Sequence, residues 1–144
     1  MLANTMISSE VNREILEKEL GLKRLSNTSI FLKDNFFVVS PSVQNIHKWF
    51  DFRKVNLNRF KEKAYEGFLL IRFFDKFLLI ELNQFVNKMI SEEKFVETKS
   101  IGVHWKFNIE QSEKKYFLRS RQDKTCIQSI NEVTIEELKN HFND

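Results

Sequence analysis

The sequence predicts a single α+β domain over residues 1–144, with a mainly antiparallel sheet of about 6–8 strands and an N-terminal, a middle and a C-terminal helix. Short runs of apolar and β-branched residues recur along the chain, separated by pairs of turn-forming residues. Helical spacing of apolar residues is found near the two ends and after residue 83. No Gly-, Ser- or Pro-rich linker divides the chain.

The N-terminal helix is predicted from four apolar residues at helical spacing: Val11, Ile15, Leu16 and Leu20. Ser8 or Ser9 can cap its start, and Gly21 stands where a C-terminal cap belongs. A first β-hairpin then joins residues 30–33 to 36–40 through Asp34-Asn35, a pair that tolerates the positive φ of a tight turn.

Residues 49–53 alternate as a strand does. Trp49, Asp51 and Arg53 share one face, and Phe50 and Phe52 share the other. The next segment, 56–63, is polar and is expected to be a loop or one short helix.

The strongest β signal is a second hairpin, residues 67–74 and 77–82, with its turn at Asp75-Lys76. In that register one face is wholly apolar, made of Leu69, Ile71, Phe73, Leu78, Ile80 and Leu82. The other face carries Arg72 diagonal to Glu81, which predicts an ion pair. We expect this hairpin to be central and covered on both faces.

The rest of the chain predicts a helix, a meander and a last helix. Asn83 is expected to cap the middle helix, with Phe85, Met89 and Ile90 directed inward. Three strands form the meander: residues 105–109, 116–119 and 125–130. Thr134 and Glu137 have the spacing of a capping box at the start of the C-terminal helix.

Composition excludes several classes of function. Three glycines cannot supply a Gly-rich phosphate loop or a dinucleotide-binding fingerprint. A single cysteine, Cys126, excludes an internal disulfide and a multi-cysteine zinc site, and it fits a reducing compartment. No signal peptide or membrane-spanning run is recognised, so a cytoplasmic protein without a membrane partner is expected, and the sequence points to no cofactor or metal.

The net charge of +3 conceals two strongly basic segments. Residues 47–63 hold six basic residues against two acidic ones, and residues 114–124 hold five against one. The rest of the chain is therefore acidic, and the last fourteen residues contribute to this. Aromatic residues interleave with both basic segments, a combination that suits phosphates and bases together.

The favoured hypothesis is therefore a small, non-catalytic nucleic-acid-binding module, such as one of a bacterial or phage defence system, that contacts DNA or RNA. The expected contact residues are Lys48, Trp49, Arg53, Lys54, Arg59, Lys61, Lys63, Lys115, Arg119 and Arg121. Trp49 is the candidate for base contact, with packing under the loop 40–44 as its structural alternative. The hypothesis requires the two segments to be neighbours in the fold.

Two other functions stay open. One is a protein–protein interaction or inhibitor protein, phage-encoded or antitoxin-like, or a homodimer, because the charge is sorted into basic and acidic regions. The other is a Mg²⁺-dependent nuclease, for which Asp51 and Glu81 are weak candidate catalytic residues. The histidines are too dispersed for a metal motif; His104 is expected to be exposed, and Cys126 to be a buried structural thiol on a strand.

Overall fold

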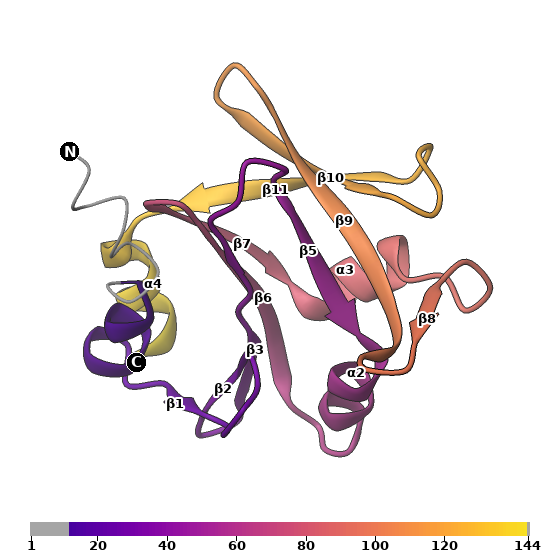
Figure 1. Ribbon diagram of the computed structural model, residues 1–144. Helices are drawn as coiled ribbons and strands as arrows, with labels where there is room; N and C mark the ends of the chain where they lie inside the picture. The colour runs from indigo at the N-terminus through magenta and orange to yellow at the C-terminus, as the bar shows by residue number, and fades with distance from the viewer. Residues whose placement is uncertain (1–11, 144) are drawn as a thin grey trace.

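The computed structural model describes residues 12–143, which form an α+β fold around a large mixed sheet (Figure 1). The strands are β1 (Lys23–Arg24), β2 (Ile30–Lys33), β3 (Phe36–Val39), β4 (Ser42–Val43), β5 (Trp49–Arg53), β6 (Glu66–Phe73), β7 (Lys76–Glu81), β8 (Val96–Thr98), β9 (Gly102–Ser112), β10 (Lys115–Ser120) and β11 (Ile127–Val133). The helical elements are η1 (Ile15–Glu19), α2 (Lys54–Lys61), α3 (Leu82–Met89) and α4 (Ile135–Phe142).

The sheet is mainly antiparallel, as predicted, but the described residues form eleven strands instead of six to eight. Its order is β1-β2-β3-β6-β7-β11-β10-β9-β5, with β4 paired to β6 and β8 to β9. The additional strands β1, β4 and β8 have two or three residues each, too few to show a repeating pattern.

The expectation of antiparallel pairing fails at β6, which runs parallel to both β3 and β4. The chain leaves β3, passes through β5 and α2, and returns to β6 in the same direction. Such a crossover is what a parallel pair requires, because a tight turn can join only antiparallel neighbours.

Both predicted hairpins form, but the second has a different turn. The first, β2–β3, turns at Asp34, whose φ is 52°. The second, β6–β7, turns one residue early, with Phe74 at φ 54°, and places Ile71 opposite Leu78 rather than Ile80. The two faces keep their predicted composition, because this slip of two residues matches the strand period.

The predicted ion pair between Arg72 and Glu81 is wrong for the same reason. Glu81 lies opposite Phe68, four residues from Arg72 along β6. That separation is about 13 Å at the rise of a strand. Arg72 donates to Ser40 instead.

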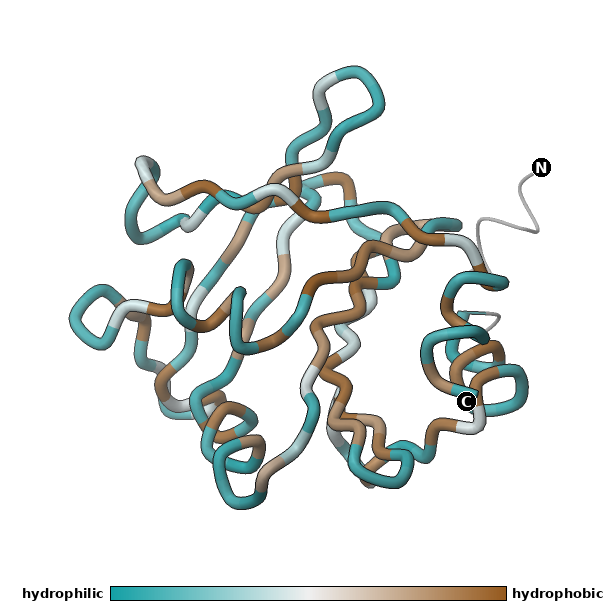
Figure 2. Tube along the Cα trace, turned by 180° about the vertical axis from the view of Figure 1, so that it is seen from behind, coloured by the Kyte–Doolittle hydropathy of each residue, from teal (hydrophilic) through white to brown (hydrophobic). Residues whose placement is uncertain are grey.

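Apolar clusters cover both faces of the central β6–β7 hairpin, as expected. The larger cluster fills the inside of the bent sheet, where Phe85 of α3 packs on Phe52 and Phe107 with ring centroids 5.3 and 5.0 Å apart. The smaller cluster lies beneath η1 and α4, with Leu16 and Phe142 among its buried members. Figure 2 shows the apolar residues gathered in the strands and the polar ones in the connecting loops.

The helices agree in part with the sequence. Leu16 and Leu20 are buried, and Gly21 ends the N-terminal helix at φ 69°; Ser8, Ser9 and Val11 lie outside the described residues. The capping box of Thr134 and Glu137 opens α4 as predicted.

The middle helix differs at its start. It begins at Leu82 after Glu81, with no side-chain cap, so Asn83 does not cap it. The polar segment after β5 is the helix α2. No helix within residues 12–143 is long and apolar enough to cross a membrane.

Candidate anion-binding surface

The fold brings the two basic segments onto neighbouring strands. β5, from the first segment, pairs with β9, and β9 pairs with β10, from the second. Trp49 therefore lies opposite Asn108, which lies opposite Arg119, in one row across the three strands. The nucleic-acid hypothesis required the two basic segments to be neighbours in the fold, and β5 and β10 are neighbours of the same strand, β9.

Around Trp49 this surface is hollowed by a cavity of about 790 Å³. We call it the tryptophan hollow; its lining is His47, Trp49, Asn108, Glu110, Arg119, Ser120, Arg121 and Lys124. Trp49 is half-buried, with the Lys106 Nζ 4.2 Å and the Arg121 Cζ 5.8 Å from its ring centroid. These are cation–π contacts, so two positively charged side chains lie against the indole ring.

Part of the charge in the hollow is neutralised within the protein. Arg119 donates to both carboxylate oxygens of Glu110, at 2.7 and 3.1 Å. This bond lowers the pKa of Glu110 and raises that of Arg119. Lys106 pairs with Asp51 at 2.9 Å. Arg121 and Lys124 have no ion pair among the described residues.

Helix α2 divides the first basic segment between two sides. Arg53 and Arg59 line one hollow, whereas Lys54 and Lys61 line another. On α2, Lys54 and Lys61 are seven residues apart and share one face, whereas Arg59 shares another face with Val55 and Asn56; Arg53 precedes the helix at the end of β5. The ten predicted contact residues therefore do not form one surface.

Three of those ten residues lie outside these hollows. Lys63 stands over the ring of Tyr65, 5.9 Å from its centroid. Lys115 is exposed at the start of β10, and Lys48 is exposed just before β5.

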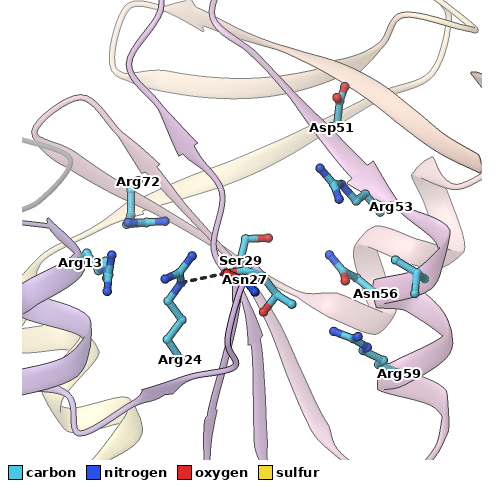
Figure 3. A pocket seen from close by; sticks show the side chains of 11 residues that line it. Arg13, Arg24, Asn27, Ser29, Asp51, Arg53, Asn56, Arg59 and Arg72 are labelled. Carbon is cyan, nitrogen blue, oxygen red and sulfur yellow. Dashed lines mark hydrogen bonds between the residues drawn. The ribbon is translucent and has the colours of Figure 1, made fainter. Parts of the chain in front are cut away.

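The hollow that contains Arg53 and Arg59 is a cleft of about 680 Å³ between β5 and the β1–β2 turn (Figure 3). We call it the arginine cleft; its lining is Arg13, Arg24, Asn27, Thr28, Ser29, Asp51, Arg53, Val55, Asn56, Arg59 and Arg72. Among the described strands β1 and β5 are the two ends of the sheet path, and the cleft lies at the seam between them, where these strands do not pair.

Within residues 12–143 the lining of the cleft contains five arginines and one carboxylate, that of Asp51. Figure 3 shows Arg13, Arg24 and Arg72 on one side and Arg53 and Arg59 on the other. Asp51 is already paired with Lys106, and Arg13 is paired with Glu17 at 2.9 Å. Among the described residues no carboxylate pairs with the other four arginines.

Arg72 is the most deeply placed of the five, with 7% of its surface exposed. Its Nε donates to the Ser40 hydroxyl at 3.1 Å, and its Nη2 donates to the Ser40 carbonyl at 2.8 Å. Burial, together with Arg13 and Arg24, lowers the pKa of Arg72 to about 10. The guanidinium is thus charged at neutral pH, in a place where a further anion is favoured.

The edge of β5 that has no strand partner among the described residues, called its free edge below, adds backbone groups to the cleft. Ile109 donates to the Lys48 carbonyl at 2.8 Å, which fixes the alternation of hydrogen-bonded pairs along β5–β9. In an antiparallel pair the groups of every second residue point away from the partner strand. The N–H groups of Asp51 and Arg53 therefore face the seam.

The two candidate metal ligands are not brought together. Asp51 lies on β5 and Glu81 on β7, with three strands between them in the sheet order. Within residues 12–143 no group of three or more His, Cys, Asp or Glu residues is placed to hold a metal ion. The nuclease hypothesis gains no support from this arrangement.

Two expectations about other reactive side chains are wrong. His104 is fully buried rather than exposed, because β9 is flanked there by β5 and β8. Its Nδ1 lies 2.9 Å from the Gly102 carbonyl oxygen. Cys126 is half-buried and precedes β11 instead of lying on it, and burial raises its pKa.

Sequence reasoning missed three residues of the cleft: Arg13, which lies two residues before η1, Arg24 of β1 and Arg72 of β6. None stands in a basic segment, so only the tertiary fold reveals their convergence. Comparison of the chain with known protein families, curated proteins and solved structures found no match.

Proposed function

We propose that this protein binds single-stranded DNA or RNA without cleaving it. The phosphates would contact the arginine cleft, and a base would contact Trp49. The observation that carries the proposal is the convergence of five arginines on a cleft in which Asp51, the one carboxylate among the described lining residues, is held by Lys106. Such a cleft attracts anions, and guanidinium groups match phosphate oxygens in a two-pronged geometry.

The spacing of the two hollows suits a polymer rather than a small anion. Trp49 and Arg53 share one face of β5 and are four residues apart, which is about 13 Å. A single strand can place a base beside the indole and a phosphate in the cleft at once, whereas a lone phosphate can occupy only one. Flat rings next to cations are the common means of holding single strands.

The binding test uses fluorescence anisotropy with DNA and RNA oligonucleotides over a series of salt concentrations. We expect the logarithm of the association constant to fall linearly with the logarithm of the salt concentration. The variant Arg53→Gln/Arg59→Gln should bind at least about tenfold more weakly, because each charged hydrogen bond contributes roughly 1.5–3 kcal/mol. The magnitude of its salt slope should decrease by about 0.7 for each phosphate that the variant no longer neutralises.

The matched control is Lys54→Gln/Lys61→Gln, which removes the same charge from the same segment on the opposite side of α2. It should keep nearly all of the affinity. Equal losses of affinity in the two variants would show that net charge alone drives binding. Absence of salt-dependent binding to every oligonucleotide would overturn the proposal.

A second function is favoured by the free edge of β5. An extended, acidic segment of a partner protein could add a strand there while its carboxylates meet the arginines. An acidic peptide that displaces the oligonucleotide, and binds more tightly than it at equal ionic strength, would favour this function.

A further inference from the structure

We propose that the arginine cleft receives the terminal phosphate of a nucleic-acid strand, in preference to a phosphodiester within the strand. This inference rests on the proposed nucleic-acid binding. It assigns an end of the strand to the cleft and leaves the tryptophan hollow for a nucleotide further along.

Charge is the first argument. A phosphomonoester carries about −1.5 to −2 at neutral pH and presents three acceptor oxygens, whereas a linking phosphodiester carries a single negative charge. Of the five arginines in the cleft, only Arg13 has a carboxylate partner among the described residues. The unbalanced charge therefore favours the group with the higher negative charge.

Depth is the second argument. Arg72, at 7% exposure, is reached only by a group that enters the cleft, and Arg24 lies beside it (Figure 3). Arg24 is fixed by its Nε, which donates to the Thr28 carbonyl at 2.9 Å, so its two terminal nitrogens stay available. A terminal phosphate enters end-on, whereas a linking phosphate carries a sugar on each side and needs an exit for both.

The start of α2 supplies further donors to the same place. Arg53 is the N-cap residue of α2 and makes no side-chain cap, and Val55 and Asn56 of the first turn line the cleft. The first amide groups of a helix have no partner within the helix and favour negative charge. These groups add to the arginines.

The experiment compares one oligonucleotide sequence in three forms: with a 5′-phosphate, with a 3′-phosphate and with hydroxyl groups at both ends. All carry an internal fluorophore and are titrated at the same ionic strength. We expect at least one phosphorylated form to bind about tenfold more tightly than the hydroxyl form, the gain of one charged contact. Inorganic phosphate at matched ionic strength should remove that advantage.

Two variants locate the effect. Arg24→Gln should abolish the preference for a phosphorylated end, while the adjacent Lys23→Gln, whose side chain lies outside the cleft, should keep it. Arg59→Gln, on the opposite wall, provides a second test should Arg24→Gln fold poorly by circular dichroism.

The outcomes separate this inference from the function on which it rests. Equal binding of all three forms, or an end preference that survives both arginine variants, would overturn the terminal-phosphate assignment and leave nucleic-acid binding intact. Failure of all three forms to bind would overturn both.

Discussion

The two sides of helix α2 carry hollows of nearly equal size whose linings differ in residue type. The arginine cleft measures about 680 Å³, and the hollow behind the helix measures about 670 Å³. We call the second one the lysine groove; its lining is Lys54, Leu57, Asn58, Lys61, Val86, Asn87, Ile90, Glu92, Phe95, Val103 and Trp105. Six of the eleven described residues that line the groove are apolar, whereas Val55 is the one apolar residue among the described residues that line the cleft.

This difference shows that basic residues close together in the sequence need not lie on one surface of the folded protein. Four cations from one short segment divide two to each side of α2: Lys54 and Lys61 share one face of the helix, and Arg59 lies on another face together with Arg53 of β5. In the groove Lys54 and Lys61 accompany apolar residues, as long lysine side chains often do. In the cleft Arg53 and Arg59 meet three more arginines from remote parts of the chain.

The largest loss of stability is expected from Phe60→Ala. Phe60 packs α2 onto the core, and residues of α2 line both hollows. Phe60 is buried under α2, with its ring centroid 5.5 Å from that of Phe37. Its ring lies so close to Gly67 that a Cβ there would come within 2.4 Å. Deleting such a ring destabilises the fold by about 3–5 kcal/mol, as urea denaturation would measure.

Val55→Ala is the control for that prediction, because Val55 is on the same helix and 49% exposed. Its effect should stay within about 0.5 kcal/mol. If Phe60→Ala were as stable to urea as Val55→Ala, the Phe60 ring would not hold α2 on the core. The two hollows would then not depend on that ring.

Ser40→Ala should disturb the arginine cleft and leave the groove intact. The buried Ser40 hydroxyl donates to the Leu70 carbonyl at 2.6 Å and accepts from Arg72. Its removal leaves buried polar groups unpaired, at about 1–3 kcal/mol of folding free energy. Chemical-shift changes confined to residues around Arg72 would agree, and changes spread equally over α3 and β9 would contradict the separation of the two hollows.

Strand faces can be predicted from sequence because they depend on local alternation. The six apolar residues of the β6–β7 face all belong to the larger core cluster, although the sequence pattern places the turn one residue late. A slip of two residues leaves each side chain on its face. The same slip changes which residues lie opposite and diagonal to one another across the two strands. For this reason the sequence pattern pairs Arg72 with Glu81, whereas in the structure Glu81 lies opposite Phe68.

The arginine cleft could not be predicted, because its residues share no local pattern. Arg24 is on a two-residue strand, and Arg72 lies among apolar residues near the end of β6. Their approach depends on the parallel pairing of β3 with β6 and on the open seam beside β5. The neighbouring β5, β9 and β10 are each predictable as strands, but their order in the sheet is not.

Trp49→Leu should separate base contact from phosphate contact. Loss of base stacking weakens single-strand binding by about 1–3 kcal/mol per base. The salt slope should stay unchanged, because no phosphate contact is removed. A steep fall in the slope would instead show that Trp49 acts by holding Lys106 and Arg121 against its ring.

The smallest effect on nucleic-acid affinity is expected from Arg119→Gln. Arg119 lies on β10, at the far end of the row that starts at Trp49 on β5. Glu110 already holds this arginine, so its removal should change nucleic-acid affinity far less than the removal of Arg53 and Arg59.

The pKa of Glu110, lowered mainly by this hydrogen bond, should rise in the variant to its ordinary value. Because the folded pKa is the lower one, the pair contributes to stability above the unfolded pKa of about 4.5 and loses that contribution as the pH falls. An NMR titration of Glu110 measures the shift, and a large affinity loss with an unmoved pKa would show that Arg119 is free to bind phosphate.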